Sequence, residues 1–68
     1  MDIVRVFAYN VRKYRTEKGL SQEALAEKAN LHRTYICAVE REKRSIALDN
    51  VQKIADTLEV ETYKLFLV

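Results

Sequence analysis

The chain has 68 residues, and 12 basic against 10 acidic side chains leave a net charge of +2. One cysteine and one histidine exclude an intramolecular disulfide and a zinc site made of these residue types. One glycine and no proline exclude a collagen-like chain. With 49% hydrophobic and 32% charged residues, the composition is typical of a small folded protein. We therefore expect a single helical domain over residues 1–68.

The spacing of apolar residues predicts five helices, the first over residues 2–18. Its apolar side chains recur every three or four residues and share one face: Val4, Phe7, Ala8, Val11 and Tyr14. Gly19 follows a turn that ends in lysine and is expected to end this helix. A second, short helix is expected over residues 22–29, with the Ser21 hydroxyl as its N-cap and Asn30 in a tight turn after it.

The third helix is expected from about His32 or Arg33 to Arg41, and the fourth over residues 48–58. Residues 61–68 are expected to form a short apolar helix or turn. Two interpretations of this C-terminal tail stay open. It folds back to complete a thin core, or it forms part of a homodimer interface, where aromatic anchors collect. The large side chains concerned are Tyr63, Leu65 and Phe66.

The sequence also bears on location. No stretch approaches the ~20 apolar residues that span a bilayer, and the first residues do not look like a secretory signal. A single unpaired cysteine favours a reducing compartment. We expect a cytoplasmic protein without membrane contact.

Charge is unevenly distributed along the chain. Basic side chains dominate residues 1–20 and 32–44, whereas residues 21–31 and 45–68 are acidic on balance. This distribution fits a basic face that binds a polyanion, and it equally fits a mixed, solvated surface.

The most informative segment is residues 21–39, which we interpret as two short helices joined by a tight turn. Such helices cross steeply, so the second one projects from the domain and fits the major groove of B-DNA. Its first residues would meet the bases. Arg33 can bond bidentately to guanine, and the methyl group of Thr34 can contact the thymine methyl.

Residues 19–31 (GLSQEALAEKANL) resemble the start of the helix-turn-helix in the phage Cro and C1 repressor class. Residues 33–36 (RTYI), 39–41 (VER) and 48–51 (LDNV) fit the same class, and the resemblance covers about residues 7–60. Within it, residues 31–36 (LHRTYI) most resemble the controller proteins of restriction–modification systems. The resemblance implies a compact five-helix bundle with its motif at about 21–41. It also implies a homodimeric, sequence-specific regulator of transcription that binds double-stranded DNA.

The resemblance further implies roles for individual residues. Arg15 and Glu40 match a buried ion pair between the first helix and the end of the recognition helix, and the loss of either partner would leave a buried charge. Two residues match base-contacting positions and two more are candidates for further base contacts: Arg33 and Thr34, then His32 and Ala38. Four residues match positions that contact phosphates: Gln22, Arg41, Lys43 and Arg44.

Tyr35 and three departures from the class pattern need separate interpretation. Tyr35 can stack on the DNA backbone. At a helix junction, however, a tyrosine more often packs its ring against neighbouring helices and keeps its hydroxyl in contact with water. Glu42 stands where the class usually has glycine. Because glutamate resists the left-handed conformation, we expect the loop after the third helix to have a different backbone conformation. Ala47 and its neighbours lack the usual proline. Cys37 replaces a small polar residue, and a lone cysteine on a helix is usually inert, with a redox role as the alternative.

Two rival functions share these features. A DNA-binding antitoxin or a small phage-type repressor would have the same fold. A helical protein-interaction module would bind no DNA and would expose the apolar tail at residues 63–68. An enzyme is disfavoured because a single histidine and a single cysteine give no nucleophile–base–orienter set. We predict no cofactor, no metal and no small-molecule ligand.

Overall fold

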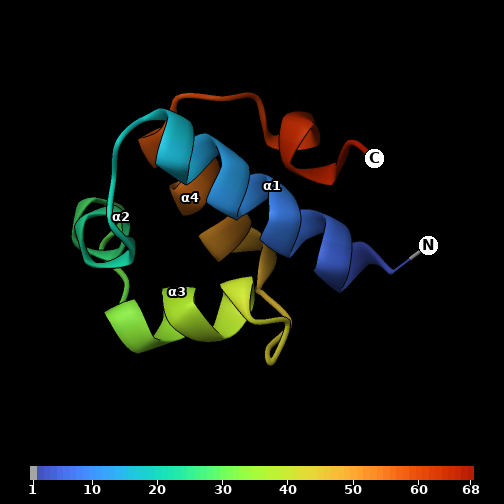
Figure 1. Cartoon of the computed structure of the whole chain (residues 1–68), viewed down its shortest axis with the longest axis horizontal. Helices are drawn as coiled ribbons and strands as arrows, with labels where there is room; N and C mark the ends of the chain where they lie inside the picture. Colours follow the sequence, from blue (N-terminus) through green and yellow to red (C-terminus); the bar gives the residue numbers. More distant parts are fainter. Residues whose placement is uncertain (1) are drawn as a thin grey trace.

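The computed structural model describes residues 2–68, which form four α-helices and one 3-10 helix (Figure 1). The bounds are α1 (Ile3–Glu17), α2 (Gln22–Ala29), α3 (Arg33–Glu40), α4 (Leu48–Leu58) and η1 (Thr62–Phe66). Their order and positions agree with the sequence prediction, and the last element, expected as a short helix or turn, is a 3-10 helix. Five residues with no side-chain cap are too short a run for a stable α-helix, and the tighter i→i+3 pattern is used in such pieces. None of the described helices is long and apolar enough to cross a membrane.

Side-chain caps begin the first two helices. The Asp2 carboxylate accepts hydrogen bonds from the backbone N–H groups of Val4 at 3.0 Å and Arg5 at 3.4 Å. The predicted cap at Ser21 is confirmed, since its hydroxyl oxygen accepts from the backbone N–H of Ala24 at 3.0 Å. Each cap satisfies N–H groups that have no partner inside the helix.

Every α-helix ends in the same way, through one residue in the left-handed conformation. These residues are Gly19, Asn30, Glu42 and Glu59, with φ between 59° and 73°. In each case two backbone N–H groups turn back to carbonyls of the last helical turn, as in a Schellman motif. The expectation that Glu42 would avoid this conformation is wrong. Its N–H donates to the Val39 carbonyl at 3.1 Å, and the next N–H donates to Ala38 at 2.9 Å, so these bonds offset the strain of a non-glycine residue.

One hydrophobic core joins all five elements. Two to four side chains come from each α-helix and one from η1: Phe7, Val11, Leu25, Ala26, Ile36, Val39, Val51, Ile54, Ala55, Leu58 and Leu65. In Figure 1, α3 and η1 lie on opposite sides of α1. The core therefore fixes α3 against α1 and α2, while the C-terminal turn covers the other side of α1.

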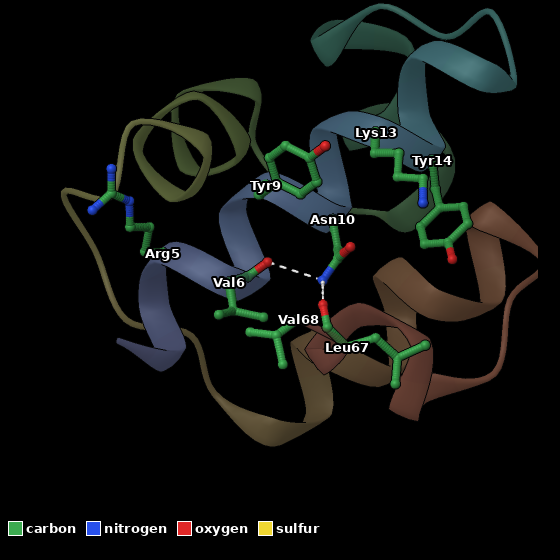
Figure 2. A pocket seen from close by; sticks show the side chains of 8 residues that line it. All are labelled: Arg5, Val6, Tyr9, Asn10, Lys13, Tyr14, Leu67 and Val68. Atoms are coloured by element: carbon green, nitrogen blue, oxygen red, sulfur yellow. Dashed lines mark hydrogen bonds between the residues drawn. The ribbon is translucent and has the colours of Figure 1, made fainter. Parts of the chain in front are cut away.

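Asn10 holds the C-terminal tail in place, which the sequence analysis missed because only its apolar neighbours were assigned to the buried face of this helix. The residue is 4% exposed, and its Nδ2 donates to the carbonyls of Leu65 at 3.1 Å and Leu67 at 2.9 Å. A third bond, at 3.1 Å, goes to Val6 in the preceding turn (Figure 2). The tail thus folds back onto α1, as one of the two interpretations expected.

The Asn10→Ala variant is expected to lower the free energy of unfolding by about 1–3 kcal/mol, because the buried Leu65 carbonyl and the part-buried Leu67 carbonyl lose their donor. Urea denaturation followed by circular dichroism measures this loss. Thr16→Ala is the matched control, since the exposed Thr16 hydroxyl bonds only to carbonyls of its own helix. Equal, small losses in both variants would contradict the role given to Asn10.

Candidate nucleic-acid interface

The turn between α2 and α3 presents the start of α3 to solvent. Asn30 adopts the left-handed conformation with φ 59°, as predicted, and the two helices pack against each other. Of the residues predicted to contact bases, His32, Arg33 and Thr34 are exposed at this end, and Ala38 is half-buried one turn further on. The structure therefore brings all four onto α3 or its cap.

His32 is the N-cap of α3. Its Nδ1 accepts from the backbone N–H of Thr34 at 3.1 Å, and the Thr34 hydroxyl lies 2.7 Å from the same nitrogen. The ring therefore helps to fix the first turn of the helix. This cap uses Nδ1 and leaves the other ring nitrogen for a ligand.

A buried network of hydrogen bonds holds the C-terminal end of α3 against α1 and α2. The Arg15 guanidinium donates to both carboxylate oxygens of Glu40, at 2.7 and 3.0 Å, and to the Leu20 carbonyl at 2.8 Å. The side chains of Arg15 and Glu40 are only 11% and 3% exposed. The predicted ion pair is thus present, and its bidentate geometry links the last turn of α1 to the last turn of α3.

Gln22 is the third member of this network. Its Nε2 donates to the same Glu40 carboxylate at 3.1 Å. One amide hydrogen is used in this way, which leaves the second hydrogen and the amide oxygen for a ligand at the start of α2. Glu40 therefore orients the side chain that the resemblance assigns to a phosphate.

The loop after α3 carries three exposed cations, Arg41, Lys43 and Arg44. The guanidinium carbon of Arg44 lies 4.9 Å from the centre of the Tyr35 ring, in a cation–π contact. Arg33, at the other end of α3, makes a loose ion pair with Glu23, in which both side chains are exposed and 3.4 Å apart. Such pairs are weak, so Arg33 can exchange this partner for another.

Tyr35 and Cys37 are both half-buried on α3. The Tyr35 ring packs against the core, as expected for a residue at a helix junction, and its hydroxyl accepts a hydrogen bond from Asn50 at 3.2 Å. The sequence analysis gave Asn50 no role. Cys37 is unpaired and lies beside Arg41 and Lys43 at a shallow hollow.

The three tail residues assigned to a dimer interface have different surroundings. Leu65 is fully buried inside the protomer, so it has no surface to offer a partner, and that assignment is corrected. Phe66 is half-buried, with its ring centre 5.3 Å from that of Phe7. Tyr63 is 60% exposed.

An apolar groove lies beside the tail. Leu48, at the start of α4, is 85% exposed at its edge, and Ile3 is 50% exposed. The groove is lined largely by apolar side chains, among them Phe7, Ile46, Val51 and Phe66.

Residues 11–65 match the family model described as helix-turn-helix. The chain belongs to the Cro/C1-type helix-turn-helix family. A hypothetical transcription factor of Neisseria meningitidis is 50% identical over 66 residues, and this chain spans 97% of its own length but only 62% of that relative. A crystal structure of a hypothetical transcription factor from Neisseria matches 97% of this chain with a TM-score of 0.94.

Two similar structures are controller proteins of restriction–modification systems. C.AhdI from Aeromonas hydrophila is 43% identical with a TM-score of 0.90, over 93% of this chain and 96% of that one. C.Esp1396I, solved as a tetramer with its natural 35 base-pair operator, is 36% identical with a TM-score of 0.87, over 97% of this chain and 87% of that one. These matches confirm the resemblance to controller proteins.

The Glu40→Ala variant is expected to lose about 3–5 kcal/mol of unfolding free energy, because Arg15 is left as a buried charge without its partner. Glu23→Ala breaks the exposed pair and is expected to cost under ~1 kcal/mol. Chemical denaturation of both variants measures the difference. Comparable losses would show that Glu40 does not brace the helix.

Proposed function

We propose that this protein is a homodimeric, sequence-specific regulator of transcription that binds double-stranded DNA in the cytoplasm, as a restriction–modification controller. One observation carries the proposal. The solvent-exposed start of α3 presents Arg33 and Thr34, while the same helix is braced at its other end by the buried pair of Arg15 and Glu40. A rigid projecting helix with polar and cationic side chains at its start fits the major groove.

The two kinds of contact have different functions. Arg33 and Thr34 read base edges, with His32 and Ala38 close by. Gln22 and the three cations of the loop bind phosphates near the C-terminal end of α3, which sets the register of the helix without reading sequence. Regulation of this kind needs no catalytic step, because a bound protein acts by occupying its site near a promoter.

The similarity to C.AhdI and C.Esp1396I favours a controller over an antitoxin. C.Esp1396I was solved on its operator, which supports DNA as the partner here. The tail does not separate this proposal from a protein-interaction module, because Asn10 holds its backbone while Tyr63, Leu67 and Val68 stay exposed. The DNA-bound structure of C.Esp1396I favours the DNA-binding function.

The apolar groove beside Leu48 is the proposed homodimer interface. A two-fold interface must be self-complementary, with the same patch on both protomers. This patch has a projecting leucine next to a hollow lined by apolar side chains, so Leu48 of one protomer fits the groove of its partner. Two recognition helices would then meet successive major grooves, about 34–36 Å apart.

Arg33→Ala and Lys43→Ala are expected to weaken DNA binding in different ways. On a preferred duplex enriched from a random pool, Arg33→Ala is expected to cost about 1–3 kcal/mol and to relax specificity at one base pair. Lys43→Ala is expected to weaken all duplexes alike and to lower the slope of log affinity against log salt by about one. Fluorescence anisotropy on preferred and scrambled duplexes at several salt concentrations measures both.

An equal loss on both duplexes for Arg33→Ala would remove it from the base contacts. An unchanged salt slope for Lys43→Ala would remove it from the phosphate contacts.

Leu48→Ser is expected to raise the dimer dissociation constant at least about tenfold, because each of the two equivalent sites loses a buried leucine. Tyr63→Ser, on the exposed tail, is the control and is expected to have little effect. Sedimentation equilibrium measures both. If Tyr63→Ser weakened the dimer and Leu48→Ser did not, the interface would lie on the tail instead of the groove.

A further inference from the structure

Tyr35 is contacted by two elements besides its own helix. The Asn50 amide reaches its hydroxyl from the first turn of α4, with Nδ2 3.2 Å from the phenolic oxygen. Arg44, from the loop between α3 and α4, covers the face of the ring at 4.9 Å. The helix α3, the loop that follows it and the start of α4 thus meet at one side chain.

The direction of the hydrogen bond determines what the Tyr35 hydroxyl can do. A phenol has one hydrogen to donate and an oxygen that accepts. Because the Asn50 NH₂ group can only donate, it occupies the oxygen of Tyr35 and leaves the phenolic hydrogen free. Among residues 2–68, no acceptor takes this hydrogen.

The surroundings of that free hydrogen favour an anionic acceptor. The Arg44 guanidinium lies against the same ring, and the loop also carries Lys43 and Arg41. An O–H donor beside a cation is well placed to bind an oxygen of a phosphate diester. A hydroxyl group whose oxygen already accepts a hydrogen bond also donates its own hydrogen more strongly.

We propose that Asn50 is a positioning residue for DNA binding, which turns the Tyr35 hydroxyl outward as a donor to a DNA phosphate. The inference rests on the proposed function and extends it to α4, an element outside the helix-turn-helix. It also unites the two interpretations of Tyr35, since the ring packs against the core while the hydroxyl serves the DNA backbone. An aspartate at position 50 would accept the phenolic hydrogen and take it away from the phosphate.

A double-mutant cycle on DNA affinity tests the coupling. Tyr35→Phe and Asn50→Ala are each expected to weaken binding about three- to tenfold, by similar factors on preferred and scrambled duplexes and with an unchanged salt slope, because neither alters a charge. In the Tyr35→Phe background, Asn50→Ala is expected to change affinity by less than about twofold. Gln52→Ala, on the exposed side of the same helix, is the matched control with unchanged affinity.

Asn50→Asp separates positioning from a merely structural role. A carboxylate in the first turn of α4 suits the helix dipole, so this variant is expected to keep the melting temperature of the unaltered protein. Its affinity for DNA is nevertheless expected to fall further than that of Asn50→Ala, and by a smaller factor when Tyr35 is replaced by phenylalanine.

Two outcomes would overturn the inference. One is an Asn50→Ala effect that is equally large with tyrosine or phenylalanine at position 35. The other is an Asn50→Asp variant that binds as well as the unaltered chain. Failure of the unaltered protein to bind any duplex would overturn the proposed function itself, and this is seen before any variant is made.

Discussion

The ion pair between Arg15 and Glu40 is the interaction on which the proposed DNA-binding surface depends. It joins α1 to the end of α3 inside the protein, where water cannot compensate either charge. The same carboxylate accepts a hydrogen bond from Gln22, so a single group aligns three helices. The packed core alone would hold α3 against its neighbours. The directional bonds also fix its rotation, which decides whether Arg33 and Thr34 face a ligand.

Short, well-defined connections complete this arrangement. The left-handed residue that ends each α-helix turns the chain sharply, so that eight-residue helices can pack against each other with little connecting backbone. The Tyr35 ring then links the loop after α3 to α4 through Arg44 and Asn50. The cations of the loop are thereby presented near α3, the proposed recognition helix, rather than distributed over the surface.

Local patterns predicted the helices well, because apolar stripes, the Ser21 cap and the Asn30 turn depend on neighbouring residues. The ion pair came from the resemblance to known repressors, since the spacing of Arg15 and Glu40 does not by itself bring them together. One of the two errors concerns a contact between distant parts of the chain, and the other concerns local backbone bonds. Asn10 depends on carbonyls more than fifty residues away, and the Glu42 conformation is imposed by backbone bonds at the end of α3.

The dimer assignment failed at Leu65 for a related reason. An apolar tail looks the same in sequence whether it covers its own core or a partner, and only the folded chain distinguishes buried Leu65 from exposed Tyr63. The spacing of Leu48 fits the inner stripe of α4, but at the first position of the helix its side chain projects into solvent. The proposed role of Asn50 could not be predicted from the sequence either, since it depends on where the Tyr35 hydroxyl lies in the folded chain.

Sequence-specific DNA binding by this protein is tested by selection of binding sites from a random duplex pool, followed by titration of the enriched duplex at two salt concentrations. We predict a short inverted repeat that is bound less tightly at the higher salt concentration, as expected for a two-fold symmetric protein that contacts phosphates. No enrichment, with weak binding that salt does not change, would contradict DNA recognition by this helix-turn-helix.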